Sequence, residues 1–279
     1  MAPTVSVIVP AFRAQATIVR AIRSLLAQTV SSWEALIVSD DGVDYGALLS
    51  AAGIEDRRLR HLSSGAIGSG AQATRNAGLA RAVGAFVAPL DADDLYYPRR
   101  LERLLPLAQS AGAAFDGLAV IDEADGRHLQ SYLTDPPDRT LSAEDYLRLP
   151  VPMMALARRD WVAGWDPAID LCDDLAFNLR LYTRQPEVPL AAEALREYRV
   201  RDGSICHSPD SAARAEAGYS ALLARLDLDG YGLEAPGLIA LARTRIAEKR
   251  DLNRAFRAAF EAGAVDTFEG FLATRRPAG

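Results

Sequence analysis

The sequence contains almost no lysine: of its 31 Lys and Arg residues, only Lys249 is a lysine. It also lacks any block of clustered positive charge, and its formal net charge is −6. Binding to nucleic-acid phosphates requires a basic surface, so these features argue against a nucleic-acid partner. Any group that binds phosphate in this chain must be an arginine, a backbone N–H or a metal ion.

Long hydrophobic runs and cysteines are also scarce. No apolar stretch approaches the ~20 residues needed to cross a bilayer, and the first strand begins almost at once, so we expect no signal peptide. Cys172 and Cys206 lack metal-ligand spacing and indicate a reducing compartment, although a disulfide between them stays open. We expect a cytoplasmic protein, with peripheral contact at the inner face of the membrane left open.

The most informative stretch is a short apolar run, residues 85–90, that ends in acids. Three carboxylates follow it within four residues: Asp91, Asp93 and Asp94. Because like charges at one strand end repel one another, we expect a cation among them, and Mg²⁺ or Mn²⁺ suits oxygen ligands and phosphates. The alternative is a polar loop that caps the next helix; one Asp would suffice for that, so three favour a metal.

The chain begins with the pattern of a parallel α/β sheet. Residues 5–9 and 33–38 read as buried strands, and the apolar positions between them have helical spacing. In such sheets ligands bind at the carboxyl ends of the strands, where Pro10, Asp41 and the acids 91–94 lie. Residues 65–70 form a glycine-rich loop before a helix over 71–82; this loop is either a phosphate cradle or a plain connection.

The remaining pattern is less regular. We predict a helix from Pro98 that kinks or ends at Pro106, a hairpin over 115–133, and strands over 153–157 and 195–200. From Ser211 the pattern is helical, with breaks at Gly230 and Gly232. We divide the chain into a nucleotide-sugar-binding half (1–100), an acceptor-binding and catalytic half (101–207) and a helical extension (208–279).

Several motifs in order resemble a family 2 glycosyltransferase of the GT-A fold, over residues 4 to 207. They include the opening strand up to Phe12, the Asp40-Asp41-Gly42 turn, Ala73-Thr-Arg-Asn-Ala-Gly78, Asp91-Ala-Asp-Asp94, and the acidic pair Asp173-Asp174. The resemblance implies a Rossmann-like, mainly parallel sheet flanked by helices, with a C-terminal helical extension.

The family's site residues carry over to matching positions. The resemblance implies that Pro10, Phe12, Asp41, Arg75, Asp91, Ala92, Asp93 and Arg201 bind the nucleotide sugar, with Phe12 packed on the nucleobase. It implies that Asp93 and Asp94 hold Mn²⁺ or Mg²⁺. Asp174 would be the general base, whereas without the other motifs it would read as a helix cap.

Three positions depart from the family pattern. Arg13 stands where Asn is usual, Val43 where a small hydroxyl residue is usual, and Arg201 where His is frequent, although His207 follows six residues later. The motif of processive members is absent, so we expect transfer of a single sugar. Trp161 and Trp165 line an acceptor pocket or belong to the core.

We therefore expect a metal-dependent, inverting transferase. It would move one sugar from a nucleotide-diphosphate sugar, with UDP preferred, to a saccharide or lipid-linked acceptor in bacterial surface polysaccharide synthesis. The alternatives are a non-catalytic nucleotide-sugar-binding protein and a sugar nucleotidyltransferase, although residues 10–14 lack the glycine and lysine of the latter. The extension after 208 is expected to serve acceptor access, membrane contact or homo-oligomer formation.

Overall fold

The computed structural model describes residues 3–201, 210–265, 268, 271, 274 and 275. They form two compact units: unit 1 comprises Met1–Pro167 with Asp174–Val200, and unit 2 comprises Ala168–Asp173 with Arg201–Gly279. None of the described helices combines the length and the apolar character that a bilayer crossing requires.

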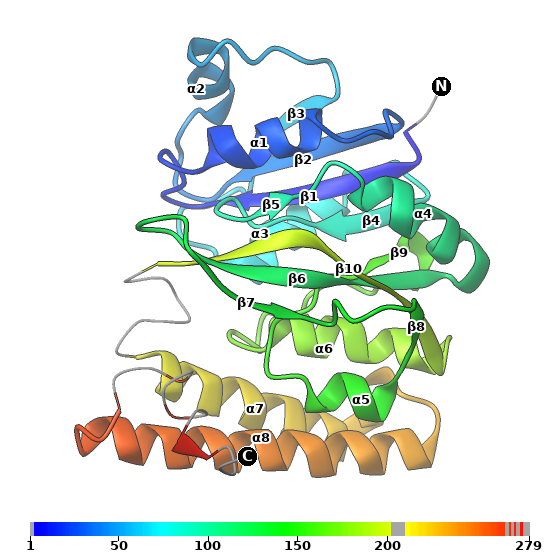
Figure 1. Ribbon diagram of the computed structural model, residues 1–279, viewed down its shortest axis with the longest axis vertical. Helices are drawn as coiled ribbons and strands as arrows, with labels where there is room; N and C mark the ends of the chain where they lie inside the picture. Colours follow the sequence, from blue (N-terminus) through cyan, green and yellow to red (C-terminus); the bar gives the residue numbers. More distant parts are fainter. Residues whose placement is uncertain (1–2, 202–209, 266–267, 269–270, 272–273, 276–279) are drawn as a thin grey trace. The chain divides into compact units, whose positions relative to one another are not determined.

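Unit 1 is built on a ten-stranded sheet in the order β3-β2-β1-β4-β9-β6-β10-β5, with β7 beside β6 and β8 beside β10. The first four of these strands follow one another downward from the top of Figure 1. The strands are β1 (Val5–Ala11), β2 (Trp33–Ser39), β3 (Leu59–Ser63), β4 (Phe86–Pro89), β5 (Leu95–Tyr96), β6 (Ala113–Asp122), β7 (His128–Tyr132), β8 (Arg139–Ser142), β9 (Leu156–Arg158) and β10 (Glu187–Val200).

The predicted parallel arrangement is confirmed for the N-terminal strands, since β1 pairs in parallel with both β2 and β4, and β2 with β3. The rest of the sheet is mixed, because β9 runs antiparallel to both β4 and β6. The predicted hairpin is confirmed by the antiparallel pair β6 and β7.

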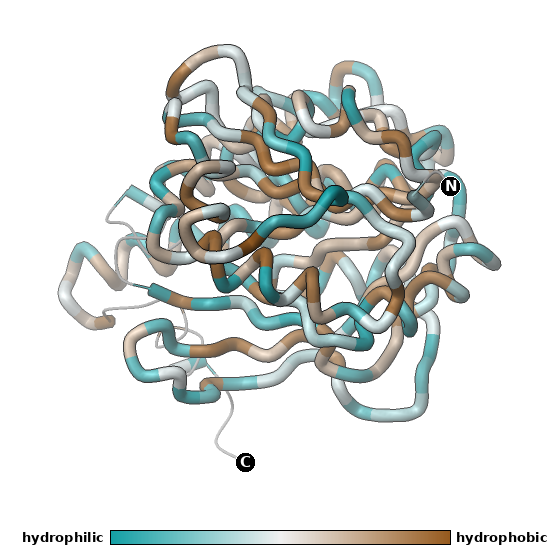
Figure 2. The backbone as a smooth tube through the Cα atoms, turned by 90° about the horizontal axis from the view of Figure 1, so that it is seen from above, coloured by the Kyte–Doolittle hydropathy of each residue, from teal (hydrophilic) through white to brown (hydrophobic). Residues whose placement is uncertain are grey.

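Alternation along β1 divides the core between the two faces of the sheet. Val5, Val7 and Val9 pack with helix α1 (Ile18–Leu26), whereas Ile8 belongs to a separate cluster on the other face. On that second face Gly78 of helix α3 (Ala71–Leu79) allows close approach, since an added Cβ would lie 2.8 Å from Ile8 Cγ2. Hydrophobic stretches alternate with hydrophilic ones along the tube in Figure 2.

Among the described residues, seven helical segments belong wholly to unit 1, namely α1 (Ile18–Leu26), α2 (Tyr45–Ala51), α3 (Ala71–Leu79), α4 (Arg100–Ala111), α5 (Ala143–Arg148) and the 3₁₀ turns η1 (Arg159–Trp161) and η2 (Arg180–Thr183). An eighth, α6 (Asp173–Leu179), begins at the boundary with unit 2.

Of the predicted kink or end at Pro106, the end is wrong, because α4 continues through this residue. A proline within a helix removes one backbone hydrogen bond, but the helix buries Leu101, Leu104 and Ala108 completely against the core. It ends instead at Gly112, whose φ of 89° is left-handed.

The strand predicted over residues 153–157 is also shifted, since β9 starts only at Leu156. The backbone before it is bound by side chains instead of a neighbouring strand. The Pro152 carbonyl accepts from Arg196 at 2.5 Å, and the Met154 carbonyl accepts from Arg100 at 2.7 Å. The Met153 N–H donates to Asp174. The last strand, β10, is longer than expected and begins at Glu187.

Unit 2 contains two long helices, α7 (Ser211–Asp229) and α8 (Pro236–Glu261), joined through the 3₁₀ turn η4 (Gly230–Gly232) (Figure 1). They run antiparallel, because Asn253 donates to the Ala212 carbonyl at 2.8 Å while Arg243 pairs with Asp227 at 2.7 Å. The predicted helical extension and its break at glycines are therefore confirmed for the described residues.

Candidate active site

The strand order places the predicted residues that follow β1, β2 and β4 at one edge of the sheet. The strands β2, β1 and β4 are parallel neighbours, so their carboxyl ends lie side by side. Residues 10–13, here called the aromatic turn, close β1; Asp40 and Asp41 follow β2; and residues 91–94, the acidic loop, follow β4. This edge is where ligands bind in open α/β sheets.

Asp41 holds the aromatic turn against the end of β2. Its Oδ2 accepts from the Arg13 N–H at 2.6 Å and from the Tyr45 hydroxyl at 2.9 Å. Its Oδ1 accepts from the Ser39 hydroxyl and the Val43 N–H, both at 3.1 Å. Burial raises the pKa of Asp41, but these donors outweigh it and hold the pKa below its usual value.

The backbone of the aromatic turn explains one departure from the family pattern. Arg13 has a φ of 51°, in the left-handed region that Asn adopts far more readily than Arg. Asp41 binds the backbone N–H of residue 13 and not its side chain, so this contact is kept when Arg stands in place of Asn. Phe12 is 47% exposed, with the Arg13 guanidinium 5.1 Å from its ring centroid, so an aromatic face is presented at the site edge.

Asp40, to which the sequence assigned no separate role, organises the glycine-rich loop. It is buried, and its carboxylate accepts from the Ser64 hydroxyl at 2.7 Å, from the N–H and hydroxyl of Ser69, and from the Gly70 N–H at 3.0 Å. Gly70 precedes α3 directly. Asp40 thus fixes the start of the helix that carries Arg75.

Arg75 and Asn76 on α3 bind two different segments. Arg75, which is buried, donates to Asp91 at 2.6 Å and so connects α3 to the acidic loop. Asn76 forms two hydrogen bonds with the backbone of Trp165, at 2.7 and 2.8 Å. Trp165 is 3% exposed and stacks on Phe177 at 4.5 Å, so of its two predicted roles the structure supports the core.

The acidic loop brings its three carboxylates together. It is closed by a hydrogen bond from the Asp94 N–H to the Asp91 carbonyl at 3.0 Å, and Ala92 is buried in the core. Asp94 is buried and accepts from the Arg199 N–H at 2.9 Å. Burial and then the charges of Asp93 and Asp91 raise the pKa of Asp94 well above its usual value.

A divalent cation at the acidic loop would need further ligands from outside the protein. In the part of the chain that the structure describes, no group of three or more His, Cys, Asp or Glu side chains could hold a metal by itself. Mg²⁺ is commonly bound by one or two carboxylates together with substrate phosphates. Burial is the main reason that the pKa of Asp94 is raised, and repulsion by Asp93 and Asp91 adds to it; a cation beside Asp93 and Asp94 would offset that repulsion.

Asp174 comes from a different element, the first turn of α6. Its Oδ2 accepts from the Met153 N–H at 2.9 Å, and its backbone carbonyl accepts from the Tyr146 hydroxyl at 3.3 Å. Arg201 is exposed directly after β10. His207 and Cys206 lie outside the described residues, so the role of His207 and the pairing of Cys206 with half-buried Cys172 stay predictions.

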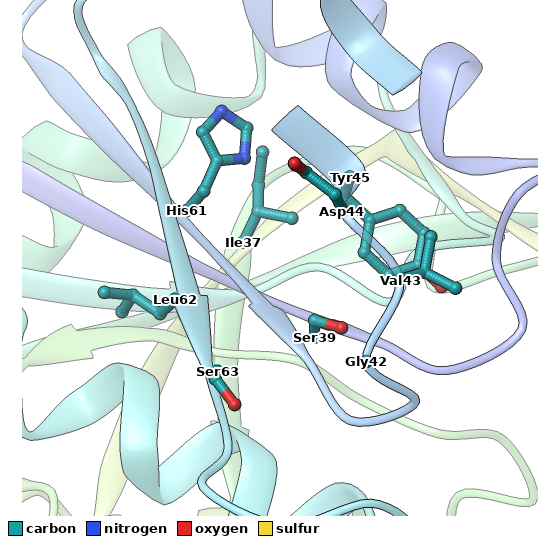
Figure 3. A pocket seen from close by; sticks show the side chains of 9 residues that line it. All are labelled: Ile37, Ser39, Gly42, Val43, Asp44, Tyr45, His61, Leu62 and Ser63. Carbon is teal, nitrogen blue, oxygen red and sulfur yellow. The ribbon is translucent and has the colours of Figure 1, made fainter. Parts of the chain in front are cut away.

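A cavity of about 300 Å³ lies beside the residues that follow Asp41. Figure 3 shows His61 from β3 and Tyr45 from α2 among the side chains that line it, with Ser39 at the end of β2. Burial lowers the pKa of His61, with partial opposition from Asp44. None of the site residues predicted from the sequence lines this cavity.

The architecture is that of the GT-A fold of glycosyltransferases. A crystal structure of residues 1–349 of S. aureus TarS in complex with UDP-GlcNAc superposes with a TM-score of 0.57 at 14% identity, covering 93% of this chain and 92% of that one. At this identity the likeness concerns the fold alone. The family "Glycosyl transferase family 2" matches residues 6–163. The chain belongs to this family.

Several curated relatives carry names from bacterial polysaccharide synthesis. The succinoglycan biosynthesis protein ExoO of Rhizobium meliloti is 40% identical over 147 residues, which are 50% of this chain and 41% of ExoO. The putative teichuronic acid biosynthesis glycosyltransferase TuaG of Bacillus subtilis is 30% identical over 76% of this chain and 85% of TuaG. The chain spans less than half the length of the first curated relatives that it matches.

Proposed function

We propose that the protein is a metal-dependent, inverting glycosyltransferase. It transfers one sugar from a UDP-sugar to a hydroxyl of a saccharide or lipid-linked acceptor, in the synthesis of a bacterial surface polysaccharide. The observation that carries the proposal is the shared edge of β2, β1 and β4, where an exposed aromatic side chain lies next to a cluster of carboxylates. The relatives' names support the polymer class, and the UDP-GlcNAc complex of TarS supports the donor class.

The donor would bind across the three strand ends. The exposed ring of Phe12 offers a stacking face for the nucleobase, beside Pro10 and Asp41. Because Asp41 already accepts four hydrogen bonds, a base that pairs with it must share or replace one of those donors. In this proposal Arg75, Asp91 and Ala92 bind the ribose and diphosphate, and Arg201 stays a predicted ligand of the nucleotide sugar.

Asp93 and Asp94 would hold Mg²⁺ or Mn²⁺ together with the diphosphate. When bound, the cation neutralises the negative charge that develops on the leaving nucleotide diphosphate. Arg75 supports this arrangement, because its ion pair with Asp91 orients the first carboxylate of the loop.

Asp174 is the proposed general base. An acceptor hydroxyl has a pKa far above 7, so a carboxylate must take its proton as the oxygen attacks the anomeric carbon. The Met153 N–H fixes one oxygen of Asp174, and the carboxylate can receive the proton. One base opposite the leaving group suffices for inversion. Residues 101–207 would thus supply the acceptor side and catalysis, and the extension after 208 acceptor access, membrane contact or self-association.

Two measurements test the proposal. Nucleotide diphosphates are screened by thermal shift with and without Mn²⁺, since a ligand that binds the native state raises its stability. UDP with Mn²⁺ is expected to give the largest shift. Release of UDP from UDP-sugars in the presence of saccharide acceptors is then measured. Binding without turnover would identify a non-catalytic nucleotide-sugar-binding protein, and no stabilisation by any nucleotide would refute the proposal.

A further inference from the structure

Two arginines that are far apart in the sequence of unit 1 bind the acidic loop. Arg20 on α1 donates through Nη2 to the Asp93 backbone carbonyl at 3.1 Å. Arg199 on β10 donates its backbone N–H to Asp94 Oδ1 at 2.9 Å. The first contact fixes the backbone of the loop, and the second fixes a carboxylate.

Both arginines share one carboxylate, that of Glu123, in the turn between β6 and β7. Arg20 forms a two-bond pair with Glu123, with both nitrogen–oxygen distances at 2.9 Å, and Arg199 Nη1 binds Glu123 Oε2 at 3.1 Å. The Glu123 N–H donates to the Val200 carbonyl at 2.8 Å, which anchors the residue beside β10. The charged groups are largely shielded, with side-chain exposures of 33% for Arg20, 23% for Glu123 and 15% for Arg199.

We propose that Glu123 is a positioning residue that sets the geometry of the acidic loop through the guanidinium group of Arg20, with Arg199 as its second partner. The inference rests on the proposed function, since it assigns the loop its ligand. Glu123 touches neither donor nor metal in this proposal. It orients the two guanidinium groups and compensates their charge. Mutation of residues that orient metal ligands through hydrogen bonds commonly lowers metal affinity by 10–100-fold.

Glu123 acts mainly on the Asp93 contact, because Arg20 reaches Asp93 with its guanidinium group, whereas Arg199 reaches Asp94 with its backbone N–H. Without Glu123, the Arg20 and Arg199 guanidinium groups would lose their shared counter-charge and Arg20 its two-bond orientation. Arg199 would keep Glu197, at 2.9 Å, whereas the contact between Arg20 and the Asp93 carbonyl would lose its support. We therefore expect the backbone around Asp93 to become more mobile than the backbone around Asp94.

The experiment compares Glu123→Gln and Glu123→Ala with Glu193→Gln. Glu193 is a matched control, because it also pairs with two arginines, Arg103 at 3.1 Å and Arg99 at 3.9 Å. These two arginines are different from those that bind the acidic loop. Amide hydrogen exchange across residues 91–97 is measured without any ligand. Loss of a charge-assisted hydrogen bond predicts exchange at least about 10-fold faster in Glu123→Ala. Unchanged exchange in a folded Glu123→Ala protein would overturn the proposal.

Binding of Mn²⁺ in the presence of UDP gives the second readout. Glu123→Gln is expected to weaken Mn²⁺ binding about 10–100-fold, and saturating Mn²⁺ should restore kcat. Glu193→Gln should match the wild type in both measurements. Equal Mn²⁺ affinity in Glu123→Gln and wild type would also overturn the proposal. If the wild-type protein binds neither Mn²⁺ nor UDP, the proposed function fails, and hydrogen exchange alone decides the positioning role.

Discussion

Replacement of Asp174 by Asn separates a catalytic carboxylate from a structural one. Asp174 accepts the Met153 N–H at 2.9 Å, and the amide oxygen of Asn can accept the same bond with nearly the same shape. The substitution removes only the negative charge and with it the ability to take a proton. Asn also caps helices about as well as Asp, so α6 should keep its start.

The two roles predict effects of different size. A positioned general base contributes about 10²–10⁴ in rate, which corresponds to about 2.7–5.4 kcal/mol of transition-state stabilisation. Exchanging a charge-assisted hydrogen bond for a neutral one costs about 1 kcal/mol of unfolding free energy. For a chain of this size such a loss lowers Tm by about 2–4 °C. The loss of turnover should therefore exceed the loss of stability by a wide margin.

The assay measures kcat for sugar transfer, the Kd for UDP with Mn²⁺, and Tm, on Asp174→Asn and on a control. Asp145→Asn is a suitable control, because Asp145 also lies in the first turn of a short helix, α5, and accepts from a hydroxyl, that of Ser142, at 2.7 Å. We expect Asp174→Asn to lose turnover with donor affinity unchanged, and the control to retain both. Transfer at the wild-type rate by a folded Asp174→Asn protein would refute the catalytic assignment.

Three further predictions concern the other parts of the site. Asp93→Asn should weaken Mn²⁺-dependent UDP binding at least about tenfold, and excess chelator should abolish turnover; full activity in chelator contradicts the metal requirement. Arg13→Asn should raise the unfolding free energy by up to about 1 kcal/mol in urea denaturation, because Asn relieves the left-handed backbone, whereas Arg13→Val should lower it. Burial raises the pKa of Asp40, but hydrogen bonds from Ser69, Ser64 and Gly70 outweigh burial and hold the pKa below its usual value. The ionised Asp40 therefore stabilises the fold fully above the unfolded pKa of about 3.9, and this stabilisation is lost as pH falls through the folded pKa. Asp40→Asn should therefore destabilise by about 1.5–3 kcal/mol at pH 7, and a gap from wild type that does not narrow below pH 4 would be evidence against this account.

The order of motifs predicted the family, and the apolar runs predicted where the strands β1, β2 and β4 end. This succeeded because buried strands such as β1, β2 and β4 need nearly continuous apolar runs, and polar residues can follow only where those runs stop. The strand ends were therefore visible in the sequence, and the acids after them as well. The strand β3 was missed, because an edge strand carries exposed polar residues such as His61 and gives no such pattern.

Other features were decided only by the tertiary structure. Arg100 and Asp116 are completely buried, and their pair at 2.8 Å joins α4 to β6, although either residue alone would be expected at the surface. The contact between Arg20 and Glu123 joins residues 103 positions apart. Local sequence determines where apolar runs begin and end, because periodicity acts over a few residues. Which charges meet depends on how the strands are ordered in the sheet, and that order is a property of the whole core.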